Sequence, residues 1–149
     1  MCAVDPAVTV SIDLPHPRHR VWDEVSRLED HVEWMADARS IEFRTPSRSG
    51  AGARMVVETR FGPLRTRDVM EVTEWVEGRR IAVRHRGLFT GAGAFTLEDL
   101  DGATRFTWSE HIRFPWWLGG PLGALAARPV FRWVWGRNLR RLAARFSAR

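Results

Sequence analysis

Residues 95–112, "FTLEDLDGATRFTWSEHI", consist of two alternating segments joined by the pair Asp101-Gly102. An Asp-Gly pair between alternating segments is the strongest short-range indication of a β-hairpin. By period-2 alternation, one face of the second segment carries its apolar residues, Phe106, Trp108 and Ile112. Glu110 falls on that same face, where a carboxylate is costly unless it has a partner or water. The stretch therefore predicts a hairpin whose apolar face holds one acid.

Alternating segments with short turns continue on the N-terminal side of this hairpin. They predict strands at 40–44, 53–61, 65–76 and 79–85, followed by the hairpin strands at 93–100 and 103–114. A further strand is predicted at 8–14, where the alternation ends before a proline. Six consecutive strands with short links predict an antiparallel meander, and the first strand makes seven.

Helical patterns flank the predicted meander. Two short helices are predicted at 16–28 and 29–35, and a long one from Pro121 to about Phe146. The long helix has one apolar stripe, made by Phe131, Trp135, Leu142 and Phe146. Pro129 should kink this helix or delay its regular part. Because a sheet that curls around one covering helix leaves space beside it, we expect one α+β domain, residues 1–149, with a hydrophobic pocket.

The composition is that of an ordinary globular chain with an uneven charge distribution. The 149 residues are 44% hydrophobic and 28% charged, enough to bury a core. All 23 basic residues are Arg, and residues 111–149 hold 8 of them and no acid, although the whole chain has a net charge of only +5. This basic segment would suit an anionic partner or form the solvated face of a terminal helix.

Cysteine usage and the chain ends bear on the compartment. Cys2 is the only cysteine, which excludes an internal disulfide and a Cys-based metal site. The segment 1–10 lacks the basic start of a secretory signal, and the longest uncharged run, residues 114–127, is too short to span a bilayer. We therefore expect a cytoplasmic protein, and the sequence leaves a monomer or a homodimer open.

Motifs for several other chemistries are missing from the sequence. It has no G-x-S-x-G elbow, P-loop or H-E-x-x-H, and the glycine-rich stretch 87–95 lacks the strand-to-helix context of a dinucleotide site, so we expect a mobile rim loop there. His16, His19 and His31 have no Cys partner and no repeated ligand spacing, so no metal site is expected. Nucleic-acid binding is not expected either, because only the abundance of Arg favours it.

Four motifs in chain order carry a resemblance to a known superfamily. They are "SIDLPHPRHRVWDEVSRLEDHVEWM" at 11–35, "GAGARM" at 50–55, "EVTEWVEGRRIAVRH" at 71–85 and the stretch 95–112 quoted above. Together with the C-terminal helix, they resemble the SRPBCC superfamily, which includes START lipid carriers, Bet v 1-like proteins and polyketide cyclase/dehydrase-type proteins. The resemblance covers nearly the whole chain.

This resemblance implies a helix-grip fold, in which a seven-stranded curved antiparallel sheet wraps on a long C-terminal helix and two short helices lie between strands 1 and 2. It also implies a cavity for a small hydrophobic, polyketide- or lipid-like molecule, and no cofactor is required. Members are carriers, ligand sensors, cyclases or chaperone cofactors, so the fold alone specifies no reaction.

Two ionisable residues are candidates for chemistry in such a cavity. His85 shares strand parity with Ile81, and Glu110 shares it with Trp108, so both could point inward. Either could orient a polar ligand group or act as general acid or base in a cyclase or dehydrase reaction. Alternatively, His85 is a satisfied wall residue and Glu110 meets water or an Arg. The catalytic residues therefore stay unassigned.

Other residues of the expected interior are candidates for contact with the ligand. Besides His85 and Glu110, they are Trp34, Met55, Met70, Phe95, Phe106, Trp108, Phe131, Trp135 and Asn138. The aromatic residues would form core and pocket wall together, and methionine suits a wall that adapts to its ligand. Asn138 could offer an amide to the interior or lie on the edge of the helix.

Trp116 and Trp117 precede the long helix, beside the basic segment. Interfacial Trp combined with Arg is typical of membrane-touching elements, and would make the chain a lipid-binding or transfer protein that docks on an anionic membrane. The alternative, which we favour, is a lid packed on the end of the barrel, because exposed Trp pairs are uncommon on monomers.

Overall fold

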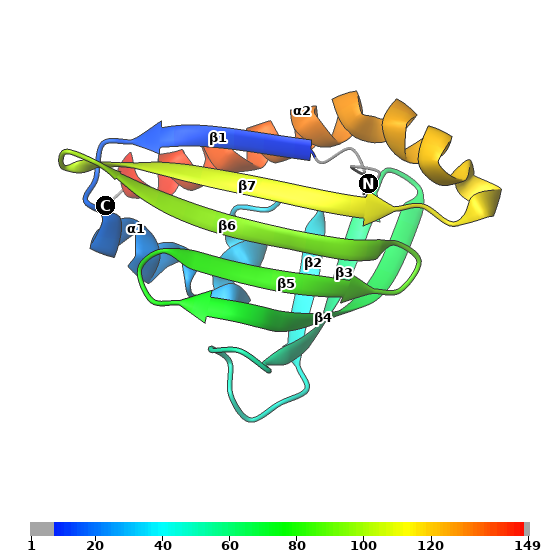
Figure 1. Ribbon diagram of the computed structural model, residues 1–149, viewed down its shortest axis with the longest axis horizontal. Helices are drawn as coiled ribbons and strands as arrows, with labels where there is room; N and C mark the ends of the chain where they lie inside the picture. The colour runs from blue at the N-terminus through cyan, green and yellow to red at the C-terminus, as the bar shows by residue number, and fades with distance from the viewer. Residues whose placement is uncertain (1–7, 148–149) are drawn as a thin grey trace, which may run out of the picture.

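The structure, a computed structural model, describes residues 8–147, so Cys2 lies outside the described part of the chain. Its seven strands are β1 (Val8–Leu14), β2 (Ala38–Phe43), β3 (Arg54–Phe61), β4 (Leu64–Val76), β5 (Arg80–Arg86), β6 (Thr90–Leu100) and β7 (Ala103–Arg113). They form one antiparallel sheet in the order β1-β7-β6-β5-β4-β3-β2. The predicted six-stranded meander is confirmed, and β1 joins it beside β7 (Figure 1).

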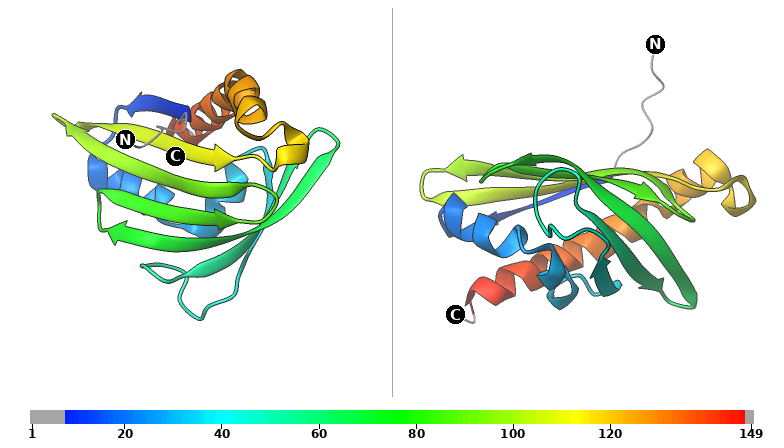
Figure 2. Two further views of the ribbon diagram at one scale, coloured as in Figure 1. Left: turned by 45° about the vertical axis from the view of Figure 1, so that its right-hand side comes forward. Right: turned by 90° about the horizontal axis from the view of Figure 1, so that it is seen from below.

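The helices gather on one face of this sheet. They are α1 (Arg18–Val25), the 3₁₀ helices η1 (Leu28–Glu33) and η2 (Trp116–Leu118), and α2 (Gly120–Ser147). Figure 2 shows the sheet curving over α1 and α2, which is the predicted helix-grip arrangement. The second short helix is a 3₁₀ helix rather than an α-helix, a form that is common in segments this short. No helix within residues 8–147 is long and apolar enough to cross a membrane.

The β6–β7 hairpin has the geometry that its sequence predicts. Leu100 pairs with Ala103, so the loop consists of Asp101 and Gly102. Both have positive φ, 51° and 89°, as a type I′ turn requires. This turn fixes the register that places Gly93 opposite Glu110.

The predicted apolar stripe of α2 packs against the sheet. Its four members, Phe131, Trp135, Leu142 and Phe146, are all buried. Pro129 lies inside α2, which begins before it at Gly120, and the helix axis bends in its orange-to-gold portion (Figure 1). The bend is expected where a proline removes a hydrogen bond of the helical ladder.

The glycine-rich stretch 87–95 is not the rim loop that we expected. β6 already begins at Thr90, so most of the stretch is strand. The glycines do not mark a loop here because at least one of them, Gly93, stands where a side chain of the neighbouring strand crosses β6, as described below.

Candidate ligand-binding cavity

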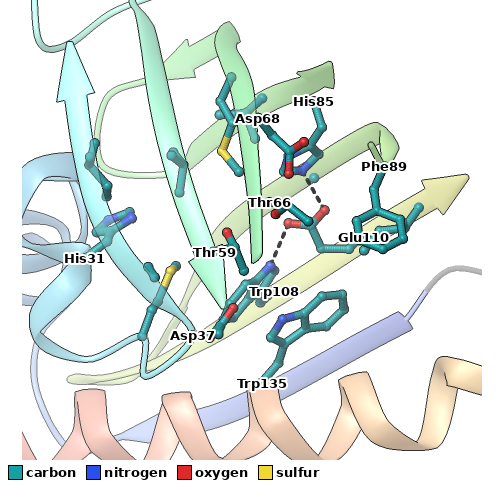
Figure 3. Close-up of a pocket in the computed structure, with 18 of the residues that line it drawn as sticks. His31, Asp37, Thr59, Thr66, Asp68, His85, Phe89, Trp108, Glu110 and Trp135 are labelled. Atoms are coloured by element: carbon teal, nitrogen blue, oxygen red, sulfur yellow. Dashed lines mark hydrogen bonds and ion pairs between the residues drawn. The ribbon is translucent and has the colours of Figure 1, made fainter. Parts of the chain in front are cut away.

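A cavity of about 130 Å³ lies between the concave face of the sheet and the helices η1 and α2. Its wall is mostly apolar and comes from β2 to β7, from η1 and the segment after it, and from α2 (Figure 3). Polar side chains are few and unevenly placed. They gather mainly on β4, β5 and β7, where Asp68, His85 and Glu110 lie close together (Figure 3).

Most of the residues expected at the ligand line this cavity, and three do not. Those that line it are Met55, Met70, His85, Phe95, Trp108, Glu110, Phe131 and Trp135. Trp34, Phe106 and Asn138 are fully buried behind the wall. Trp34 packs edge-on against Phe106 and Trp108, with ring centroids 6.3 and 6.0 Å apart. Its indole N–H has no hydrogen-bond partner.

Asn138 holds α2 to the chain between η1 and β2. Its side-chain oxygen accepts the backbone N–H of Ala36 at 3.0 Å, and its amide nitrogen donates to Asp37 Oδ1 at 2.6 Å. Of the two positions left open by the sequence, the interior is therefore the observed one. Through Asn138 the helix positions Asp37, which lines the cavity.

Glu110 contacts a histidine and an indole in the cavity wall. Its Oε2 lies 2.8 Å from Nε2 of His85, and its Oε1 accepts the Trp108 indole N–H at 3.0 Å (Figure 3). The side chains of His85 and Glu110 are 13% and 8% exposed. The acid on the apolar face of the hairpin is thus a partnered, buried carboxylate.

Two glycines make room for the buried carboxylates. A Cβ at Gly93 would lie 2.4 Å from Glu110 Oε1, so any side chain there would displace the carboxylate. Because β6 carries no side chain at this position, Glu110 on β7 reaches across it toward β5 and His85. Similarly, a Cβ at Gly87 would lie 1.8 Å from Asp68 Oδ1.

The electrostatics of this cluster favour a protonated histidine. Burial lowers the pKa of His85, but the negative charge of Glu110, its hydrogen bond and the charge of Asp68 outweigh burial, so the net pKa is raised. Burial raises the pKa of Asp68, although hydrogen bonds from Thr66 and from the Leu88 backbone N–H oppose that rise. Both the His85 imidazole and the Asp68 carboxyl group therefore have a raised pKa, and the imidazole is hydrogen-bonded to Glu110.

Two further polar groups face the cavity from η1 and the segment after it. Burial lowers the pKa of His31 to about 4, so its ring is neutral, and Nε2 donates to the carbonyl of Val25 at 2.7 Å. Burial also raises the pKa of Asp37, which the hydrogen bond from Asn138 partly offsets.

Asp68, Asp37 and His31 were not among the residues that sequence reasoning placed in the cavity. Asp68 could have been found, because it shares the inward parity of Met70 on β4. Asp37 and His31 lie outside the strands, where no period-2 pattern indicates which way a side chain points. Within residues 8–147, no group of three or more His, Cys, Asp or Glu side chains is arranged to hold a metal ion.

Trp116 and Trp117 are exposed, so they are not the packed lid that we favoured. Their exposed fractions are 87% and 58%. With four exposed residues of α2 they form what we call the apolar patch, which consists of Trp116, Trp117, Leu122, Leu125, Val130 and Trp133. The four helical members fall on one side of α2 by their spacing, away from the buried stripe.

A curved sheet that wraps on a long helix around a mostly apolar cavity defines the helix-grip class of proteins. The chain belongs to the family described as "Polyketide cyclase / dehydrase and lipid transport", whose model matches residues 5–147. The resemblance to the SRPBCC superfamily is thereby confirmed.

Individual relatives agree with this assignment. The uncharacterized protein Rv1546 of Mycobacterium tuberculosis is 28% identical over 129 residues, which are 83% of this chain and 87% of that protein. The crystal structure of TTHA0849 from Thermus thermophilus matches with a TM-score of 0.80 over 96% of this chain and 98% of that one, at 20% identity. That of Ara h 8.0201 matches with a TM-score of 0.69 over 97% and 100% of the two chains, at 13% identity. At such identities these structures establish the fold alone.

Proposed function

We propose that the protein binds a small hydrophobic molecule in the cavity between the sheet and α2. The observation that carries this proposal is a cavity of about 130 Å³ with a mostly apolar wall and a buried His85–Glu110 pair. Protein interiors otherwise pack closely, so a space of this size with polar groups facing it suits a ligand. An engineered cavity of about 150 Å³ holds benzene, so the ligand of this cavity has about one or two rings or an equivalent chain.

A cavity-filling variant tests the proposal. Val57 on β3 lines the cavity, and Val57→Phe would occupy part of it, whereas Val56→Phe makes the same change on the opposite face of the strand. Native mass spectrometry of gently purified protein should find a small molecule bound to the wild type and to Val56→Phe, and much less on Val57→Phe. Equal loading of the two variants, with both folded, would contradict binding in this cavity.

Proton transfer on the bound molecule, as in a cyclase or dehydrase, is a finer form of this proposal. The His85–Glu110 pair favours it, because a buried imidazole that shares a proton with a carboxylate can act as general acid or base. Once a ligand is identified, Glu110→Gln should abolish its conversion and leave its binding measurable. If the wild type and Glu110→Gln bind the ligand equally and neither converts it, the pair only orients the ligand.

A second candidate function, docking on an anionic membrane to bind or transfer lipid, is favoured by the apolar patch. Trp116 and Trp117 are fully available to an interface, and Arg132 and Arg137 flank the helical part of the patch. Arg137 lies 5.5 Å from the ring centroid of Trp133, which places a cation beside an interfacial aromatic. Residues 111–149 hold no acid that would repel anionic lipid headgroups.

Vesicle co-sedimentation tests this docking. The double variant Trp116→Ala/Trp117→Ala should lose most binding to vesicles that contain phosphatidylglycerol. Val69→Ser/Val76→Ser, which removes exposed apolar side chains of the sheet, should bind as the wild type does. Binding of the wild type should also weaken in high salt. No binding at low salt, or equal loss in both double variants, would remove the membrane hypothesis.

A further inference from the structure

The ionisable residues of the cavity wall differ from those of the rest of the chain. The chain has 23 Arg and a net charge of +5, yet none of the residues within 8–147 that line the cavity is an Arg. The wall instead holds three acids, Asp37, Asp68 and Glu110, and two histidines. Its ionisable side chains therefore differ from those that give the whole protein its positive charge.

Several hydrogen-bond donors beside these acids are already engaged. The Trp108 indole N–H donates to Glu110, and the Leu88 backbone N–H and the Thr66 side chain serve Asp68. Asn138 donates to Asp37 from behind the wall. What the acids still offer to a ligand are oxygen lone pairs, because a carboxylate can accept several hydrogen bonds.

The two histidines of the wall, His31 and His85, add no unpaired positive charge to it. His31 is neutral and uses its Nε2–H on Val25, so its other ring nitrogen is an acceptor. The Nε2–H of His85 faces Glu110 Oε2 at 2.8 Å, so the positive charge of a protonated His85 is balanced by this carboxylate. A carboxylate, phosphate or sulfate on a ligand would find no uncompensated cation in this wall and would approach Asp68 and Glu110 against like charge.

We infer that the ligand is an uncharged or cationic ring compound that carries hydrogen-bond donors, such as phenolic or alcoholic hydroxyls or an amine, and that the cavity rejects fatty-acid and other anionic headgroups. This inference rests on the proposed function and specifies the ligand class of the same cavity. The acids Asp68 and Glu110 accept the ligand's donors, and the apolar wall covers its rings.

Matched probes of one ring system test the inference near neutral pH. They are naphthol, naphthylmethylamine and naphthoate, which are uncharged, cationic and anionic, with naphthalene as the reference. Binding is followed by the NMR signals of isotope-labelled methionine methyl groups, because Met35, Met55 and Met70 all line the cavity. Naphthol and naphthylmethylamine should bind at least about tenfold more tightly than naphthoate. Equal or tighter binding of naphthoate would overturn the inference.

Isosteric variants identify the groups that set this preference. In Asp68→Asn and in Glu110→Gln the ratio of naphthol to naphthoate affinity should narrow by several fold. It should stay unchanged in Glu98→Gln, which removes an exposed acid of β6 outside the cavity. A ratio that does not narrow in either cavity variant, with both folded, would overturn the role of these acids.

Failure of the inference and failure of the proposed function give different results. If naphthalene and naphthol shift the methionine signals and naphthoate does so equally, the cavity binds hydrophobic molecules without the proposed selectivity. If none of the four probes shifts these signals and native mass spectrometry finds no bound molecule, the proposed function itself is wrong.

Discussion

The two halves of α2 share one helix and have opposite surroundings. The anchored half, residues 134–147, buries Trp135, Asn138, Leu139, Leu142 and Phe146. The projecting half, residues 120–133, buries Phe131 but exposes Leu122, Leu125, Val130 and Trp133, and it extends past the end of β7 (Figure 1). The comparison teaches that one end of this helix completes the core and the cavity, whereas the other leaves an apolar surface that nothing in residues 8–147 covers.

The side-chain contacts of the halves differ in the same way. In the anchored half, Arg145 pairs with the buried Glu24 of α1, and Arg141 donates to the Glu33 carbonyl of η1. At the border of the two halves, Arg137 lies beside the exposed ring of Trp133, which belongs to the projecting half. Contacts with buried groups, as in the anchored half, stabilise the fold. An exposed contact such as that of Arg137 changes the stability of the fold very little.

The largest difference in stability is expected when the same leucine-to-alanine change is made in each half. Leu142 is fully buried, so Leu142→Ala should lower the free energy of unfolding by about 2–5 kcal/mol. Leu122 is 77% exposed, so Leu122→Ala should change it by less than about 0.5 kcal/mol. Urea denaturation of both variants measures the difference. Similar losses in the two variants would mean that the projecting half is covered in solution.

Asn138→Ala tests the polar link of the anchored half. It removes the acceptor of the Ala36 N–H and the donor to Asp37, and leaves two partly buried groups without these partners. We expect a loss of about 2–3 kcal/mol in the free energy of unfolding. Asn138→Asp keeps an acceptor but faces Asp37 with a second acid, so its stability should improve as the pH falls. A wild-type denaturation midpoint for Asn138→Ala would contradict the link.

Protonation of His31 should loosen the region that the anchored half holds. Burial lowers its pKa from 6.5 to about 4, so between these values the unfolded chain binds a proton that the folded chain does not. Its contribution to stability is present above pH 6.5 and is lost as the pH falls toward 4.

From about pH 7 to about pH 5 this loss is about 2 kcal/mol. It is measured as the difference between wild type and His31→Gln in urea denaturation at both pH values, because the other groups titrate in both proteins. Identical pH profiles would show that His31 takes up its proton in the folded state.

A small effect is expected for the cation that lies beside the projecting half. Arg137→Ala removes an exposed cation–π contact with Trp133 and should cost less than about 1 kcal/mol. Arg145→Ala, farther along the anchored half, removes a hydrogen bond to a buried carboxylate and should cost about 1.5–3 kcal/mol. Thermal denaturation of the two variants compares them, and a reversed order would contradict the division of the helix.

The fold followed from the sequence because strands and helices differ in period. The β6–β7 hairpin was predictable to its turn, since Asp101-Gly102 accommodates positive φ and both flanking segments alternate. The start of β6 was missed because glycines there look like a loop in sequence. Gly93 is required by the close approach of the Glu110 side chain, and Gly91 by the close approach of the His111 backbone. Both are contacts between strands, which cannot be read along the chain.

The site was predictable where parity applies. His85 and Glu110 were placed inward correctly, but their hydrogen bond depends on the register of β5, β6 and β7 together. Trp34 could not be assigned to the wall or to the layer behind it, because helical and 3₁₀ segments give no fixed inward direction. The exposure of Trp116 was misjudged for a different reason, since a general preference for burying Trp carries no information about the end of one particular sheet.

The Glu110 carboxylate can occupy its position only because Gly93 has no Cβ atom. Alanine at position 93 would place its Cβ 2.4 Å from a carboxylate oxygen, although alanine ordinarily favours a strand more than glycine does. In the course of evolution the two positions should therefore change as a pair. Relatives that carry a larger residue at the position of Gly93 should have lost the acid opposite it, and with it the ligand preference proposed for this cavity.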